Sequence, residues 1–165
     1  MRANHRIWLA ALAAVLLIGI GASLSFAKAP AARAAADPWS AAQVMQPAAL
    51  AHELAGKGGK PLVICVGFRV LYQGGHIAGA KYAGPASSAA GRAKLRAFVK
   101  NLPRDQAIVL YCGCCPWAMC PNIRPAFSLL QRMGFTNVKV VHIAQNFRTN
   151  WAGSGYRVVQ GAAGK

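Results

Sequence analysis

The sequence predicts an α/β fold in which a central parallel sheet is covered by helices on both faces. Three short apolar runs, at residues 62–66, 107–111 and 138–143, have the nearly continuous hydrophobicity of strands that are buried on both sides. Segments with helical periodicity separate these runs, and the connections between them are short. Strands that alternate with helices form βαβ units, which build parallel sheets.

The first half of the domain is predicted to contain one helix, one strand and one loop. Apolar residues recur at helical spacing over residues 39–54, and the glycine-rich residues 56–59 end this predicted helix. The run at residues 62–66 is rich in β-branched side chains and is predicted to be a buried strand. Residues 72–79 contain three glycines and are predicted to form a loop.

The middle of the chain continues the alternation. A second helix is predicted over residues 89–102, because its leucines, phenylalanine and valine fall on one face. After a turn at residues 103–106, the strand at residues 107–111 leads directly into Cys112. A third helix is predicted over residues 123–133.

The last elements complete the sheet. Gly134 ends the third helix, since glycine is the usual residue just after a helix C-terminus. Residues 138–143 form the third predicted strand, a short helix follows near residues 145–151, and a tail at residues 156–159 closes the domain. No internal repeat interrupts this order.

The N-terminal residues predict export. Arg2 and Arg6 flank a short polar start, and an almost wholly apolar run over residues 7–20 is followed by small residues. This pattern is typical of a signal peptide, here residues 1–27. The apolar run is shorter than the roughly 20 residues of a spanning helix, although residues 21–26 extend it enough for an uncleaved signal anchor. Either form places the domain in the periplasm or another exported location.

The single domain expected over residues 39–165, after an Ala-rich flexible lead-in at residues 28–38, belongs to a strongly cationic chain. The formal net charge is +16, and only three residues are acidic. An exported protein rarely meets nucleic acid, so we expect no nucleic-acid partner. Small anions, an acidic partner protein or an anionic membrane surface fit the charge through long-range steering. A solvated basic surface without a specific partner is the alternative.

Four of the five cysteines lie within nine positions: Cys112, Cys114, Cys115 and Cys120. Bridges within so short a segment close only small loops and therefore stabilise a fold little, so the cluster indicates a site. An odd number of cysteines leaves at least one thiol unpaired within the chain. The fifth, Cys65, is expected to be a buried free cysteine, or to approach the cluster from a neighbouring strand.

Five blocks of the sequence resemble the rhodanese family, in the family's order. Residues 62–67 resemble the strand that ends in Asp-Val-Arg, and residues 72–80 are similar to the block Tyr-x-x-Gly-His-Ile-x-Gly-Ala. Residues 108–112 resemble the strand that delivers the catalytic cysteine, and weaker matches lie at residues 134–138 and 151–158. Together the blocks span nearly the whole domain, which implies a rhodanese-like fold.

The resemblance implies a sulfurtransferase site at Cys112. In the family this cysteine takes a sulfane sulfur from a donor, becomes a persulfide and passes the sulfur to a nucleophilic acceptor. The sequence departs from the family pattern at Cys65, where an acidic residue is usual, and at Gly67, where arginine is usual. The loop after Cys112 is also several residues longer and contains three further cysteines.

The loop itself supports thiolate chemistry. The strand leads through Gly113 and its neighbours, a loop rich in Gly, Cys and Pro, to the N-terminus of a helix. Backbone N–H groups in such a loop point inward, so they bind anions and lower the pKa of a cysteine held there. Asn122 is expected to cap the helix with its side chain. Arg124 is expected to hold an anionic substrate such as thiosulfate, or else to be a solvated helix residue. Trp117 is expected to cover the pocket or to pack beside it.

The additional cysteines allow three interpretations. In the first, Cys112 is the nucleophile and Cys114 or Cys120 resolves its persulfide by forming a disulfide, with Cys115 assisting. In the second, all four bind a thiophilic metal such as copper(I), zinc or an iron–sulfur cluster, although their spacing matches no familiar zinc pattern. In the third, two form a local disulfide and only Cys112 reacts. No cofactor is expected in the first and third cases.

A function without turnover is the alternative to an enzyme. The cysteine loop would then belong to a module that binds a metal or a haem-protein partner, or to a catalytically silent rhodanese fold that docks a partner through its basic surface. Metal content and the number of free thiols distinguish these alternatives from sulfur transfer.

Overall fold

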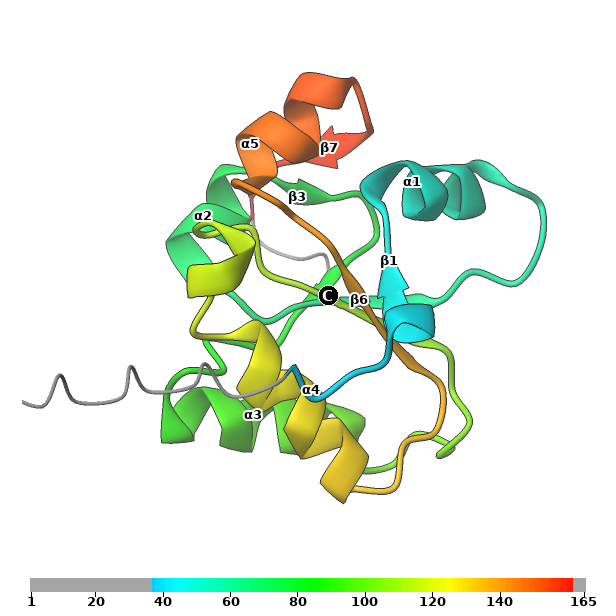
Figure 1. The fold of residues 1–165 in the computed structure, drawn as a ribbon, viewed down its shortest axis with the longest axis vertical. Helices are drawn as coiled ribbons and strands as arrows, with labels where there is room; N and C mark the ends of the chain where they lie inside the picture. Colours follow the sequence, from blue (N-terminus) through cyan, green and yellow to red (C-terminus); the bar gives the residue numbers. More distant parts are fainter. Residues whose placement is uncertain (1–36, 162–165) are drawn as a thin grey trace, which may run out of the picture. The chain divides into compact units, whose positions relative to one another are not determined.

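The computed structural model describes residues 37–161 (Figure 1). The predicted signal peptide at residues 1–27, and the lead-in up to residue 36, lie outside this range, so export stays a prediction. Between residues 37 and 161, no helix has the length and apolar character needed to cross a membrane.

The core of the domain is a five-stranded parallel sheet with the strand order β1-β6-β5-β2-β4. The central strand, β5, lies between β2 and β6, and each of these three strands has four residues. This arrangement confirms the three strands expected from the apolar runs. The strands are β1 (Val44–Met45), β2 (Leu62–Cys65), β4 (Lys81–Tyr82), β5 (Ile108–Tyr111) and β6 (Val138–Val141).

Helices cover both faces of the sheet, as the sequence predicts. On one face, α3 (Ala89–Val99) and α4 (Ile123–Arg132) lie side by side (Figure 1) and share a buried apolar cluster with the strands. A second apolar cluster on the other face includes residues of α1 (Pro47–Ala55), α2 (Arg69–Gly74) and α5 (Phe147–Asn150). Neighbouring residues of one strand contribute to different clusters because side chains alternate between the faces of a sheet.

The helix predicted over residues 39–54 is shorter than expected. Only a turn of 3-10 helix (Ala41–Gln43) forms at its start, and α1 begins at Pro47. Proline has no N–H group, so a helix that continued through Pro47 would lose its hydrogen bond to the residue four positions earlier. Gln46 is extended, as the residue before proline prefers. Val44 instead pairs with Val140 in an edge strand of the sheet.

The segment predicted as a loop at residues 72–79 contains regular structure. The last turn of α2 lies within it, and β3 (His76–Ile77) pairs antiparallel with β7 (Val158–Val159). The imidazole Nδ1 of His76 lies 2.8 Å from the carbonyl oxygen of Tyr72, and the two rings stack at 3.7 Å between centroids. These contacts hold the glycine-rich segment against the second apolar cluster.

Candidate functional site

The candidate site is the loop of residues 112–122, which connects the central strand β5 to α4. A turn of 3-10 helix (Trp117–Met119) lies in its middle. Two backbone hydrogen bonds fix the loop to the segment that follows β6: the N–H of Phe147 donates to Gly113 at 3.0 Å, and the N–H of Trp117 donates to Ala144 at 3.0 Å. The loop is therefore held by contacts far from it in the sequence.

Gly113 makes the first of these contacts possible. Its φ angle is 81°, in the left-handed region that side chains other than glycine rarely adopt. A Cβ atom at this position would lie 2.8 Å from the Cβ of Phe147. Both the conformation and the close approach therefore require glycine directly after Cys112.

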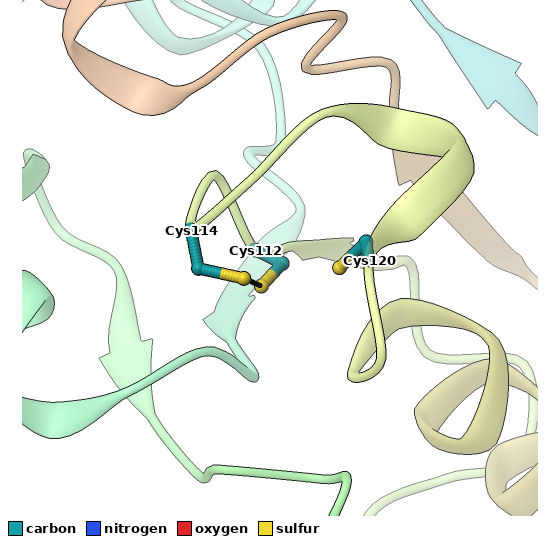
Figure 2. A group of neighbouring side chains, drawn as sticks. All are labelled: Cys112, Cys114 and Cys120. Carbon is teal, nitrogen blue, oxygen red and sulfur yellow. Dashed lines mark hydrogen bonds between the residues drawn. The ribbon is translucent and has the colours of Figure 1, made fainter.

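The loop brings three of the predicted cysteines together. The Sγ atoms of Cys112, Cys114 and Cys120 all lie within 4.8 Å of one another, and Figure 2 shows the three side chains pointing toward a common point. The thiol of Cys112 donates to the Sγ of Cys114 at 3.2 Å. Cys112 and Cys120 are buried, whereas Cys114 is half-buried. The fourth, Cys115, has its Sγ 2.9 Å from that of Cys114 and lies outside this group of three.

Asn122 has a different role from the one expected. It occupies the N-cap position of α4, but its side chain makes no capping hydrogen bond, so the prediction of a side-chain cap is wrong. The fully buried amide instead points its Nδ2 at Cys112 and Cys114, with Sγ distances of 3.5 and 3.7 Å, while its Oδ1 accepts from the N–H of Ser87 at 2.9 Å. Burial requires the amide to be satisfied by partners other than water, and the sulfurs and Ser87 are those partners.

The cysteines of the cluster differ in the pKa of their thiols. The hydrogen bond donated by Cys112 lowers the pKa of Cys114 to about 5. The same donor, helped by the N–H groups of Asn122 and Ile123, lowers the pKa of Cys120 to about 7. The pKa of Cys112 is raised, because this thiol is the donor to both neighbours and is buried. The loop stabilises thiolate as expected, but the negative charge rests on the neighbours of Cys112.

The other two cysteines, Cys115 and Cys65, are protonated thiols at neutral pH. Burial raises the pKa of Cys115 to about 12, and the hydrogen bond with Cys114 contributes to the shift. Burial also raises the pKa of Cys65 to about 11. Cys65 follows the expectation of a buried free cysteine, and it also lines a small cavity together with Cys112.

Arg124 is engaged in contacts that stabilise the loop. Its Nε donates to Asp37 at 2.7 Å, and its Nη1 donates to the carbonyl oxygens of Trp117 and Ala118 at 3.3 and 3.5 Å. The guanidinium group also lies 5.7 Å from the ring centroid of Trp39. These contacts replace the solvated side chain that was the simpler expectation, and anion binding by Arg124 stays a prediction.

The space beside Cys112 is small. One cavity of about 20 Å³ is lined by Cys65, Gly67, Cys112 and Gly113, among others. A second, of about 10 Å³, lies between the cysteines and Trp117. Each has room for about one water-sized group. The indole of Trp117 therefore packs over the cysteines, and it also contacts the rings of Trp39 and His142.

A much larger cavity lies elsewhere in the described part of the chain. It has a volume of about 720 Å³, and none of the five cysteines lines it. Its walls come from α1, β2, β3 and the C-terminal segment, with Lys60 and Arg157 among the lining residues. This cavity is therefore separate from the two small spaces that the cysteines line.

Solved structures share this arrangement of sheet and helices. The rhodanese-like domain of the Alr3790 protein from Anabaena sp. is 18% identical, with a TM-score of 0.53 over 72% of this chain and 79% of that chain. The BH2092 protein from Bacillus halodurans is 20% identical, with a TM-score of 0.55 over 73% of this chain and 80% of that one. The fold is rhodanese-like.

A thiosulfate sulfurtransferase from Pseudomonas aeruginosa contains a similar domain. It is 21% identical, with a TM-score of 0.53, and the match covers 72% of this chain but 19% of the larger protein. No protein-family model and no curated protein matches the chain. The resemblance seen in the sequence is therefore confirmed at the level of the fold.

In this rhodanese-like domain, Cys112 directly follows the central strand β5. Gly67 lies beside it, because a Cβ at Gly67 would be 3.1 Å from the Cys112 Sγ. The absence of a side chain where the family usually has arginine leaves the sulfur open on that side. The contacts of Gly67 and Asn122 with the cysteine cluster are not apparent from the sequence, since both residues lie at least ten positions from one of their partners.

Proposed function

We propose that this domain transfers sulfane sulfur through Cys112, with Cys114 as the thiol that resolves the persulfide. The observation that carries the proposal is the 3.2 Å contact between the two Sγ atoms at the end of the central strand. A nucleophile and a second sulfur at this distance need little movement either to exchange a proton or to form a bond.

The first step uses the contact for proton transfer. The Cys114 sulfur is a thiolate at neutral pH, because its pKa is about 5, and it lies 3.2 Å from the Cys112 thiol. It accepts the Cys112 proton while the Cys112 sulfur attacks the sulfane sulfur of thiosulfate. A new S–S bond forms to Cys112, the S–S bond of thiosulfate breaks, and sulfite leaves with the electron pair. Cys112 now carries a persulfide, and the cavity of about 20 Å³ beside it gives room for about one such atom.

The second step uses the same contact for bond formation. Cys114, which carries the proton taken from Cys112, gives this proton to the outer sulfur of the persulfide and attacks the Sγ of Cys112. A disulfide forms between the two residues, the S–S bond of the persulfide breaks, and the outer sulfur leaves as hydrosulfide. The two cysteines are oxidised, and the sulfane sulfur is reduced to sulfide. A dithiol reductant returns the disulfide to two thiols by exchange. Cys120 and Cys115 assist by exchanging protons with this pair.

Thiosulfate is the proposed donor because of the charge of the chain. A net charge of +16 attracts a small dianion over long distances. Gly113 and Trp117 line the spaces beside Cys112, and the entering anion would contact them first. We place this reaction outside the cytoplasm, in line with the export signal expected at residues 1–27.

The test is a mass measurement on the reduced chain after reaction with thiosulfate. From the wild type we expect sulfite and sulfide in equal amounts and a disulfide between Cys112 and Cys114, because Cys114 resolves the persulfide. The Cys112→Ser variant should show none of these products. The Cys114→Ser variant should slow the first step, because the proton acceptor is lost, but should accumulate the persulfide without releasing sulfide. Met119→Ala, an exposed change in the same loop, is the matched control.

Two results would overturn the proposal. Sulfite release that persists in Cys112→Ser would place the nucleophile on another cysteine. The absence of sulfite release from the wild-type chain, with all five thiols shown to be reduced, would favour a domain without turnover that binds a metal or a partner.

A further inference from the structure

The group formed by Cys112, Cys114 and Cys120 has the size of a metal site. Three sulfurs bound to one ion at about 2.3 Å lie roughly 4 Å apart. The three Sγ atoms lie within 4.8 Å of one another, and those of Cys112 and Cys114 are 3.2 Å apart. Changes of about 1 Å or less, which side-chain rotation provides, would therefore place all three at bonding distance from a common ion.

The type of ligand atom indicates which class of metal ion the site would bind. All three donors are thiol sulfurs, which favour soft ions such as copper(I) and zinc. Zinc in structural sites takes four ligands in a tetrahedron, but no His, Asp, Glu or further Cys among residues 37–161 joins this group. Copper(I) is satisfied by three sulfurs in a plane. The three-sulfur set therefore fits copper(I) better than zinc.

The surroundings suit a thiolate complex. The amide Nδ2 of Asn122 lies 3.5 Å and 3.7 Å from two of the sulfurs. Such donors spread the negative charge of metal-bound thiolates and fix their orientation.

The site is also shielded from water. Trp117, Ile123, Val141 and Ile143 line the small space beside the cysteines. Two of the three sulfurs belong to buried side chains. An apolar enclosure of this kind limits the access of water and oxidants to a bound copper(I) ion.

We propose that Cys112, Cys114 and Cys120 form a three-thiolate site that binds one copper(I) ion. Binding forms three Cu–S bonds and releases the protons of those sulfurs that are still thiols. Neither copper nor sulfur changes its oxidation state. This inference goes beyond the proposed sulfur transfer and shares Cys112 with it, so copper and thiosulfate would compete for the same sulfur.

The test is a titration of the full, reduced chain with copper(I) under anaerobic conditions, against a chromophoric copper(I) chelator. We expect one ion per chain. Cys120→Ser and Cys114→Ser should each weaken the affinity by about a hundredfold, since each removes one of three ligands. Cys115→Ser is the matched control, because Cys115 lies outside the group, and it should bind copper as the wild type does.

X-ray absorption on the copper-loaded wild type tests the geometry without any variant. We expect three sulfur neighbours and no nitrogen or oxygen neighbour. A loss of affinity in Cys115→Ser as large as that in Cys120→Ser, a two-sulfur or four-sulfur spectrum, or tighter binding of zinc than of copper(I) would overturn the proposal. The titration contains no thiosulfate and the persulfide measurement contains no copper, so either proposal can fail while the other stands.

Discussion

The buried amide of Asn122 lies between two parts of the chain, with its Nδ2 3.5 Å from the Sγ of Cys112 and its Oδ1 bonded to the N–H of Ser87. One side chain thus orients the sulfur cluster and joins the loop to the segment before α3. Its location in the core follows from this double contact, because an amide without partners would be costly to bury.

Replacement of this amide should affect both stability and thiol acidity. We expect Asn122→Ala to lower the free energy of unfolding by about 1–3 kcal/mol, because the Ser87 N–H loses its partner inside the protein. The pKa of Cys114 should rise, because the Nδ2 donor that helps to lower it is lost. Chemical denaturation measures the first effect, and thiolate absorbance as a function of pH measures the second. The exposed change Asn137→Ala should produce neither, and an unchanged Cys114 pKa in Asn122→Ala would contradict the assigned role.

Gly113 offers a test of the loop geometry with an internal control. Gly113→Ala should lower the melting temperature, because it adds a Cβ at 2.8 Å from the Phe147 Cβ to the strain of a φ angle of 81°. Gly155 has a φ angle of 78° but nothing within 4 Å of an added Cβ, so Gly155→Ala carries the backbone strain alone. We expect about 1 kcal/mol of destabilisation for Gly155→Ala and clearly more for Gly113→Ala. Equal effects in the two variants would mean that the loop moves freely away from Phe147.

The cysteines should react with iodoacetamide in a defined order. Cys114 is half-buried and has a pKa of about 5, so it is a thiolate at pH 7 and should be alkylated first. Its labelling should slow only as the pH falls through about 5, whereas a thiol with the ordinary pKa of 9.0 already slows below about pH 9. Cys65, buried and with a pKa of about 11, should be labelled last. Peptide mass analysis of a time course measures the order, and early labelling of Cys65 would show that β2 does not protect it.

Substitutions in the ion pair of Arg124 and Asp37 distinguish two possible roles of the arginine, which are binding thiosulfate and stabilising the loop. If Arg124 binds thiosulfate, Asp37→Asn should release its guanidinium group and lower KM, while Arg124→Met should raise KM. If the arginine only stabilises the loop, Arg124→Met should lower kcat without a change in KM. Neither change should cost more than about 1 kcal/mol of stability through the ion pair itself, since both side chains are partly exposed. Thiosulfate saturation curves decide between the two roles.

The central strands could be predicted from the sequence because their apolar character is local. Residues of β2, β5 and β6 have apolar neighbours in the chain. Such a continuous apolar run is enough to predict a strand that is buried on both faces of the sheet. The position of Cys112 followed directly, since it comes after the last residue of β5. The first helix could not be placed correctly, because β1 depends on pairing with β6, almost a hundred residues away.

The internal order of the candidate site depends on contacts that a sequence pattern does not contain. Which sulfur donates and which accepts is decided by side-chain directions within the loop, as the contact between Cys112 and Cys114 illustrates. Asn122 is a residue type that favours the N-cap, and it occupies the N-cap position of α4. Its amide nevertheless contacts Ser87 and the sulfurs instead of the first turn of the helix. The capping preference of asparagine therefore predicted the position of Asn122 correctly and its hydrogen-bond partner wrongly, since the tertiary contacts outweigh a single capping hydrogen bond.

The two edge strands of the sheet, β1 and β4, have only two residues each. An exposed edge is a template on which another chain can add a strand, and its danger grows with the length of its unpaired N–H and C=O row. Here each row is short, and β4 contains Lys81, a charge of the kind that discourages pairing. The apolar strands that could aggregate most readily lie inside the sheet, so the domain should resist strand-by-strand association even when its chains are concentrated.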